Sequence, residues 1–226
     1  SVLIFLPIRL IGFISVLIIF FHNSLDIFKA DDFLELRWLW LLLHEAGFVT
    51  PWTEAKLLIA YPIIPWFAVM ALGYSIAPWL LKCLTQQPRY LTYSGLVLIT
   101  LFIALRYFNN YGDPKPWQIQ DEFLATIFSF INCEKYPPSL LYLLVTLGLS
   151  SLLLAGLNSF EVSLGKLGKI LKTFGQVSLF FYLLHLPVIH LIALILAYIN
   201  GFETDWLFHE PFFSKPVDYG YSLTAV

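Results

Sequence analysis

Five long apolar segments are the feature that most constrains the fold of this chain. They lie at residues 9–28, 57–81, 90–107, 137–157 and 173–199. Each is close to the ~20 residues that an α-helix needs to cross a ~30 Å hydrocarbon core. Lipid offers no hydrogen-bond partner to backbone groups, and these segments lack the period-two alternation of barrel strands. The sequence therefore predicts an all-α, polytopic membrane helical bundle that forms one integral membrane domain over residues 1–226.

Composition excludes several classes of protein. Of the 226 residues, 59% are hydrophobic and only 12% are charged, whereas charged residues make up ~25% of soluble domains. No basic patch suits a nucleic-acid groove. Cys83 and Cys133 are expected near opposite faces of the bilayer, too far apart for the ~7 Å Cα separation of a disulfide. The five histidines are scattered, so the sequence predicts neither a metal site nor a nucleic-acid partner.

The two ends of the chain resemble interrupted transmembrane segments. Residues 1–6 have the apolar character of the end of an earlier helix, and residues 221–226 have that of the start of another. We therefore expect a fragment of a longer bundle, truncated at both ends.

Basic residues predict the orientation of the bundle. If all five segments cross the membrane, one set of connections contains a single acidic residue, Glu161. The same set contains the basic residues Arg9, Lys82, Arg89, Lys166, Lys169 and Lys172. The other fourteen of the fifteen acidic residues lie in the opposite set. By the positive-inside rule the first set is cytoplasmic. The long connections 29–56, 109–123 and 200–226 are then expected outside the cytoplasm.

Two further segments are expected at a membrane surface. Residues 33–43 mix acidic and aromatic side chains, as a helix lying on the membrane does. Lys166, Lys169 and Lys172 lie close together in the segment LGKLGKILK. Anchoring of the topology explains these lysines. The alternative is that their ammonium groups meet the phosphates of an anionic cofactor that reaches them from the cytoplasm.

A charged pair precedes a double proline at the start of the fourth apolar segment. Proline is tolerated in the first turn of a helix and disfavours a helical residue before it. Tyr136 should therefore be extended, and a new helix should begin at Pro137 or Pro138. Residues 125–131 are too few to cross the membrane and predict a half-helix. Such a break exposes backbone N–H groups that can hold an anion beside Lys135. The alternative is an interfacial turn whose lysine snorkels toward headgroups.

The last apolar segment contains a polar stripe. At 100° per residue, Ser178, Tyr182 and His185 lie within ~60° of one another on a helix. His185 lies near the middle of the span, where an ionisable side chain is by default a candidate for function. The sequence predicts His185 as a candidate catalytic residue beside Ser178 and Tyr182. The alternative is a histidine that packs against a neighbouring helix.

Other polar residues are expected at the outer mouth of the bundle. Arg106 and Asp113 belong to the segment RYFNNYGDPKPW, and Trp66 lies near the outer end of the second span. His22 and Asp26, four residues apart, form a further polar pair. Turn formation alone explains Asn-Tyr-Gly-Asp-Pro. Binding of a substrate is the alternative for Arg106 and Asp113.

Four segments resemble one family of membrane proteins. They are YPIIPWFAVMALGY, LRYFNNYGDPKPW, KYPPSLLYLLVTLG and FGQVSLFFYLLHLPVIH. They are similar to the bacterial membrane family related to the catalytic domain of heparan-alpha-glucosaminide N-acetyltransferase, and the likeness runs along nearly the whole chain. The resemblance implies a multi-pass acyltransferase of the bacterial plasma (inner) membrane. An acyl group, expected to be acetyl, would pass from cytoplasmic acyl-CoA to a sugar or similar hydroxyl or amine across the membrane.

The resemblance also bears on the site residues. Family members usually carry a proposed catalytic histidine in an early, Asp-rich and Arg-containing segment, and nothing in this chain matches that segment. The matched positions are expected to contribute to a substrate pocket. They are Trp66, Arg106, Asp113, Lys135, Tyr136, Ser178 and Tyr182. His185 is then a candidate general base for the acceptor.

Two other functions stay open. A transporter could use the break before Pro137 as a substrate site near the membrane midplane. An inverted repeat would favour that function, and the sequence has none. A non-catalytic membrane scaffold would leave the polar stripe dispensable.

Overall fold

The computed structural model of the chain describes residues 5–49, 57–159 and 165–209. Within these residues, five helices are long and apolar enough to cross a membrane. The first is the continuous segment Ile8–Ile27, made of α1 (Ile8–Phe21) and the 3-10 helix η2 (His22–Ile27) that follows it. The others are α3 (Ile63–Gln86), α4 (Arg89–Phe108), α6 (Leu140–Ser159) and α8 (Ser178–Ile199). The predicted helical fold with five spans is confirmed at this level. The expected helix fragments at residues 1–4 and 221–226 lie outside the described residues.

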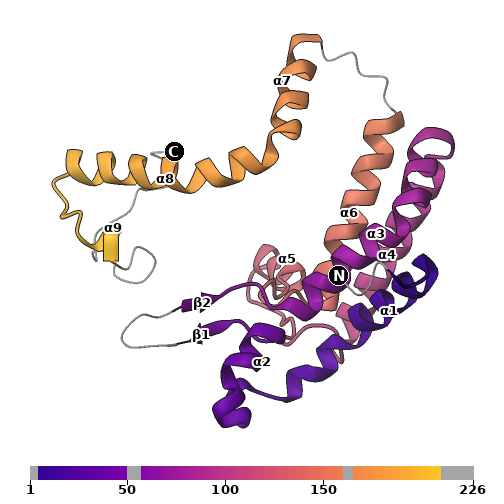
Figure 1. Ribbon diagram of the computed structural model, residues 1–226, viewed down its shortest axis with the longest axis horizontal. Coiled ribbons are helices and arrows are strands. Elements are labelled where there is room, and N and C mark those ends of the chain that lie inside the picture. The colour runs from indigo at the N-terminus through magenta and orange to yellow at the C-terminus, as the bar shows by residue number, and fades with distance from the viewer. Residues whose placement is uncertain (1–4, 50–56, 160–164, 210–226) are drawn as a thin grey trace. The chain divides into compact units, whose positions relative to one another are not determined.

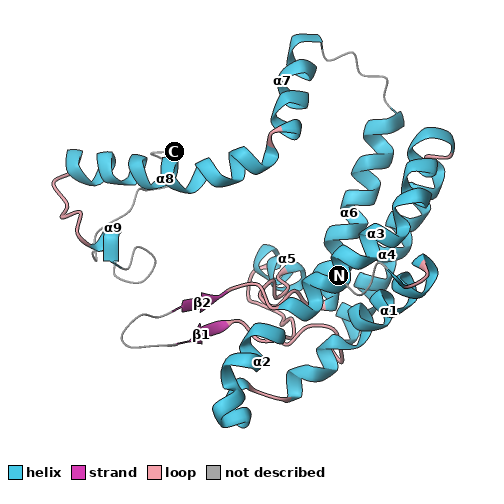
Figure 2. Cartoon of the chain, viewed as in Figure 1, coloured by secondary structure: helices cyan, strands magenta, loops and turns pink. Residues whose placement is uncertain are grey.

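Shorter elements connect these helices. They are the 3-10 helices η2 (His22–Ile27) and η3 (Ala30–Leu36), the helices α2 (Arg37–Leu43), α5 (Phe123–Ile131), α7 (Gly165–Gln176) and α9 (Trp206–His209), and the strands β1 (Gly47–Val49) and β2 (Leu57–Ile59). The strands pair antiparallel with Gly47 opposite Ile59, and Figure 2 shows how small this sheet is beside the helices. The half-helix predicted over residues 125–131 is confirmed as α5.

The contacts divide the chain into two compact units, Ser1–Glu161 and Val162–Val226. In the first unit, α4 packs along α6 and α1 packs along α3, as Figure 1 shows. The core of this unit lies between these four helices and includes Ile19, Ala68, Phe102, Leu141 and Leu144. In the second unit, α7 leads into α8.

Two close approaches fix the packing of α4 on α6. A Cβ atom placed on Gly95 would lie 2.9 Å from the carbonyl oxygen of Gly148. A Cβ atom placed on Gly148 would lie 2.9 Å from the side chain of Ile99. Small residues at helix interfaces let backbones approach closely inside a membrane.

The boundaries of three spans differ from the prediction. The second was expected to start at residue 57, but Leu57–Ile59 pairs with β1 and α3 begins only after Pro62. The fourth begins at Leu140, two residues after the double proline. The last was expected at 173–199, but Val177, at φ −107° and ψ 27°, separates α7 from α8. In each case a local backbone constraint ends or starts a helix inside an apolar run.

Candidate functional site

A small cavity lies at one end of the first unit, where the connections between its helices meet. We call this end of the first unit, which contains the last turn of α1 and the first turn of α6, the site end. The cavity has a volume of about 180 Å³. Its charged and polar lining residues are Asp26, Lys29, His44, Glu45, Glu134 and Tyr136. Three of these residues carry carboxylates and one is a lysine, so the cavity is acidic.

His44 is held in this wall by Asp26. His44 follows α2 and is 2% exposed. Its Nε2 lies 2.8 Å from Oδ1 of Asp26, while Oδ2 of the same carboxylate accepts a hydrogen bond from the Asn23 amide at 2.8 Å. A carboxylate only accepts hydrogen bonds, so Nε2 of His44 carries a proton. In the neutral imidazole, Nδ1 is therefore an acceptor.

The second nitrogen of His44 is unusual. Nδ1 is buried and has no hydrogen-bond partner among the described residues. A buried acceptor without a partner costs free energy, and a catalytic role is one explanation for such a group. The other buried side-chain atoms without a hydrogen-bond partner in the described part of the chain are indole N–H donors, such as those of Trp40, Trp66 and Trp117, so His44 Nδ1 is the one basic nitrogen among them. The neighbouring rings are those of Trp40, 5.4 Å away between centroids, and His22, 6.3 Å away. The Asp26–His44 pair thus presents an oriented imidazole with one unused basic nitrogen.

The side chains of the polar pair His22 and Asp26 lie close enough to interact electrostatically, but each makes its hydrogen bonds with other partners. His22 is buried, and its ring nitrogens lie 2.9 Å from the carbonyl oxygens of Ile19 and Pro138. Asp26 bonds to His44 and Asn23 instead. His22 therefore joins the end of α1 to the double proline that precedes α6.

The backbone N–H groups at the start of α6 all donate hydrogen bonds to acceptors within the protein. The backbone N–H of Leu140 donates to Oδ1 of Asn23 at 2.8 Å, and that of Leu141 donates to the carbonyl of Gly112 at 3.0 Å. Ser139 accepts from the N–H of Tyr142 through its hydroxyl, and its own N–H donates to Glu134. The prediction that this break exposes N–H groups to an anion is therefore wrong. Side chains and loop carbonyls have taken the positions that an anion would need.

Arg106 and Asp113 lie behind the cavity wall. Arg106 is 1% exposed and donates to the carbonyls of Ser129, Phe130 and Asn132 at 2.7–3.0 Å, and to that of Lys115 at 2.8 Å. The first three carbonyls end α5 or follow it directly, where helix carbonyls lack internal partners and carry negative partial charge. This guanidinium therefore stabilises the end of the half-helix.

The carboxylate of Asp113 holds the loop between α5 and α6 in place together with Arg106. One carboxylate oxygen accepts from the N–H of Glu134 at 2.8 Å and from the hydroxyl of Ser139 at 2.7 Å. The other accepts from the N–H of Lys115 and lies 3.7 Å from Nη1 of Arg106. Neither Arg106 nor Asp113 lines the cavity. Both were expected to bind substrate, but the described contacts use them to position Glu134 and the chain before α6.

Lys135, Tyr136 and Trp66 belong to an aromatic group beside the cavity. The ammonium of Lys135 lies 5.0 Å from the ring centroid of Tyr136, which packs edge-on against Tyr61 at 5.4 Å. Tyr61 in turn contacts Trp66 at 6.0 Å. A hydrogen bond with Tyr136 raises the pKa of Lys135, and hydrogen bonds with Tyr61 and Lys135 lower the pKa of Tyr136. Only Tyr136 of this group lines the cavity.

The remaining predicted residues lie in the second unit. On α8, Nδ1 of His185 bonds to the backbone carbonyl of Tyr182, and its ring stacks on Phe181 at 6.1 Å. The side chains of Ser178 and Tyr182 are exposed. Lys166, Lys169 and Lys172 are exposed on α7. Their predicted roles stay predictions, and among the described residues His185 contacts Phe181 and Tyr182 of its own helix.

Sequence reasoning missed His44 and Glu45. Both lie in a connection that was expected to be an outer loop, and neither stands in a recognisable motif. The only local signal is a His-Glu pair directly after the apolar helix RWLWLLL. Among the described residues, no group of three or more His, Cys, Asp or Glu side chains could hold a metal ion. No protein-family model, curated protein or solved structure matches this chain.

Proposed function

We propose that the chain is a multi-pass membrane acyltransferase in which His44 acts as the general base. The acyl donor is acyl-CoA, and the acceptor is the hydroxyl or amine of a sugar-like molecule bound at the site end. The observation that carries this proposal is the buried imidazole of His44, oriented by Asp26 at 2.8 Å, with an unpartnered Nδ1. The four segments that resemble an acyltransferase family support the same reaction class.

The reaction follows from the unpaired nitrogen. His44 Nδ1 takes the proton of the acceptor O–H or N–H as that atom attacks the thioester carbonyl carbon. The tetrahedral intermediate then expels the CoA thiolate, which recovers the proton from the imidazolium. Asp26 does not exchange a proton in this sequence. Its negative charge stabilises the imidazolium that forms between the two steps.

The lining of the cavity suits a polar acceptor. Tyr136 offers an aromatic face of the kind on which sugar rings stack, and Glu45 and Glu134 offer hydrogen-bond acceptors. Glu45 is itself held by the N–H of Ala30 at 2.7 Å. By the positive-inside rule the site end faces away from the cytoplasm, so the proposal requires the thioester of cytoplasmic acyl-CoA to reach the site end between the spans of a bacterial inner membrane.

The transporter alternative has less support. It relied on free backbone N–H groups at the break before α6, and the N–H groups of Ser139, Leu140, Leu141 and Tyr142 are bonded within the protein. A scaffold has no use for a buried, unpartnered imidazole nitrogen, which lowers stability without improving packing.

Acyl transfer by the purified chain in lipid nanodiscs tests the proposal. Acetyl-CoA is supplied with glucosamine or glucose, and release of the CoA thiol is followed together with the mass of the product. His44→Gln should reduce turnover ~10²- to 10⁴-fold while the melting temperature changes little. His185→Gln is the matched control, since it makes the same change at the other candidate base. A large loss in the control with full activity in His44→Gln would move the base to α8, and no turnover in the unmodified chain would reject the acyltransferase.

A further inference from the structure

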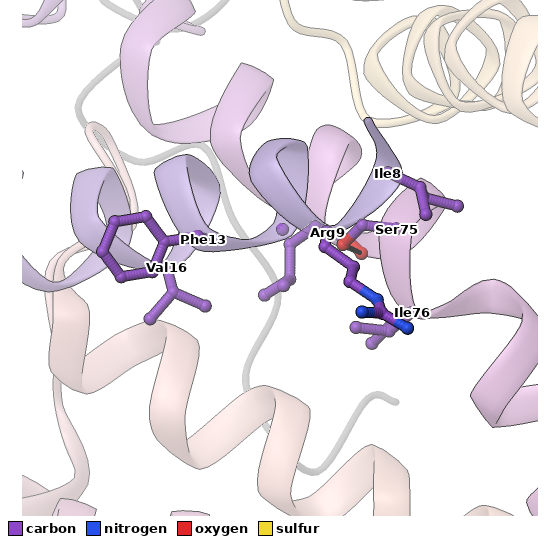
Figure 3. A pocket seen from close by; sticks show the side chains of 8 residues that line it. Ile8, Arg9, Phe13, Val16, Ser75 and Ile76 are labelled. Atoms are coloured by element: carbon purple, nitrogen blue, oxygen red, sulfur yellow. Dashed lines mark hydrogen bonds between the residues drawn. The ribbon is translucent and has the colours of Figure 1, made fainter. Parts of the chain in front are cut away.

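A second cavity lies between α1 and α3, at the opposite end of the first unit from His44. It is a groove of about 380 Å³. Apolar side chains of α1 and α3 form its walls, namely Ile8, Phe13, Val16, Leu72 and Ile76. Figure 3 shows Arg9 beside Ser75 and Ile76 at one end of the groove, with Phe13 and Val16 toward the other. This groove uses no residue of the proposed acyl-transfer site.

Gly12 and Ser75 form the floor of the groove. A Cβ atom on Gly12 would lie 2.9 Å from Oγ of Ser75, so the two helices can approach this closely only with glycine there. The Ser75 hydroxyl donates to the carbonyl of Leu72 at 2.8 Å. Its polarity is therefore satisfied inside α3, and the groove presents an apolar surface apart from Arg9.

Arg9, which the positive-inside rule places on the cytoplasmic side, has no acidic partner among the described residues. It lies in the first turn of α1, where backbone N–H groups already give the helix a positive end. That turn contains no acidic residue, and no ion pair joins Arg9 to another residue of the described chain. A cation at this position repels the helix dipole. An anion placed there would interact favourably with both the guanidinium and the helix start.

We propose that the groove binds one anionic phospholipid. The phosphate lies against Arg9 and the start of α1, and one acyl chain follows the trench between Phe13, Val16 and Leu72. Both helices belong to apolar spans long enough to cross a membrane, with α1 as the first part of Ile8–Ile27, so a trench along them opens to the hydrocarbon layer. An arginine can bind a phosphate through two parallel hydrogen bonds. A soluble anion such as free phosphate would leave the apolar walls unused.

The experiment measures lipid retention by native mass spectrometry of the full chain purified in a neutral detergent. The probe is palmitoyl-oleoyl phosphatidylglycerol, compared with phosphatidylcholine of the same chains. We expect phosphatidylglycerol to be retained preferentially with one lipid per chain. Arg9→Gln should lower its retention about tenfold, as expected for loss of a ~1.4 kcal/mol interaction. Val16→Trp should lower retention of both lipids, because the indole fills the trench.

Arg89→Gln is the matched control. Arg89 is also exposed in the first turn of a long helix, but it contacts Tyr90 at 5.5 Å and does not line the groove. The control should retain phosphatidylglycerol like the unmodified chain. Equal losses for Arg9→Gln and Arg89→Gln would mean general charge attraction and would overturn the proposal. Displacement of the lipid by free phosphate or acetyl-CoA at millimolar concentration would also overturn it, by assigning the groove to a soluble anion.

Discussion

The imidazole of His44 donates from Nε2 to Oδ1 of Asp26 across 2.8 Å and so joins the end of α2 to the segment that follows α1. The two residues are 18 positions apart. The bond fixes the tautomer of His44 and leaves Nδ1 as the basic nitrogen. Because both side chains contribute to one proton-transfer unit, their substitutions should not act independently.

A double-mutant cycle tests this dependence. Asp26→Asn replaces a pure acceptor by an amide that can also donate, so His44 can adopt either tautomer and its imidazolium loses a counter-charge. Acyl transfer should fall ~10²- to 10⁴-fold, and adding His44→Gln should cause little further loss. Turnover of the two single variants and the double variant provides the measurement. Losses that multiply would show that Asp26 and His44 act separately.

The helices were largely predictable from the sequence, because burial in lipid imposes a length and a composition on each span. The short α5 was predictable for the same reason, since residues 125–131 are apolar but too few to cross. The residues at which the helices begin and end were less predictable. Leu57 to Ile59 are as apolar as a span, yet they pair with β1, and the start of α6 depends on Asn23, which is 117 residues from Leu140.

The site was less predictable than the fold. Arg106 and Asp113 stood out as polar residues near a membrane, but their function depends on which carbonyls and N–H groups the loops bring to them. No periodicity or residue spacing in the sequence pointed to His44 as a functional residue. It meets Asp26 only because the folded chain brings the end of α2 next to η2. Hydrophobic pattern is a local property of the chain, whereas hydrogen-bond partners are chosen by tertiary structure.

Arg106 should be among the most important residues for stability. Arg106→Leu leaves four carbonyl acceptors and the buried carboxylate of Asp113 without their partner, so unfolding in detergent should become easier by ~3–5 kcal/mol. Arg106→Lys should lie between this variant and the unmodified chain, because an ammonium lacks the planar fork. Arg89→Leu, at an exposed position, should change stability by no more than ~0.5 kcal/mol. Similar effects at both arginines would contradict the supporting role of Arg106.

Asn23 should stabilise the start of α6. Asn23→Ala removes the acceptor of the buried Leu140 N–H, which should cost ~1–3 kcal/mol. Asn158 provides a comparison, since its amide donates to the carbonyl of Leu84 at an exposed position. Asn158→Ala should therefore change the unfolding midpoint only slightly. If Asn23→Ala unfolds at the same denaturant concentration as the unmodified chain, water must replace the amide at Leu140.

Cysteine accessibility tests the orientation proposed from the charges. Cys83 is 2% exposed and is a poor reporter, so both native cysteines are first replaced by alanine. Lys115 has a side chain that is 70% exposed at the site end, and Lys82 is exposed near the opposite end of α3. A membrane-impermeant maleimide should label Lys115→Cys in intact cells, and Lys82→Cys only after permeabilisation. The opposite pattern would invert the orientation.

The reactivity of Cys133 should depend on pH in a way that reports its burial. Burial, assisted by the negative charge of Asp113, raises the pKa of the Cys133 thiol from 9.0 to about 11. Only the thiolate reacts with an alkylating reagent, so near pH 8 the folded protein should react ~100-fold more slowly than an ordinary thiol with a pKa two units lower.

The raised pKa of Cys133 also determines how the stability of the folded chain depends on pH. Because the folded state favours the protonated thiol, the contribution of Cys133 to stability is fully present below pH 9 and is lost as the pH rises toward 11. Alkylation by iodoacetamide, followed by mass spectrometry in a Cys83→Ala background, should therefore show a midpoint near pH 11 for the folded chain and near pH 9 after denaturation. A folded midpoint at or below the denatured one would mean that Cys133 is solvated, and that the loop held by Asp113 packs less closely than described.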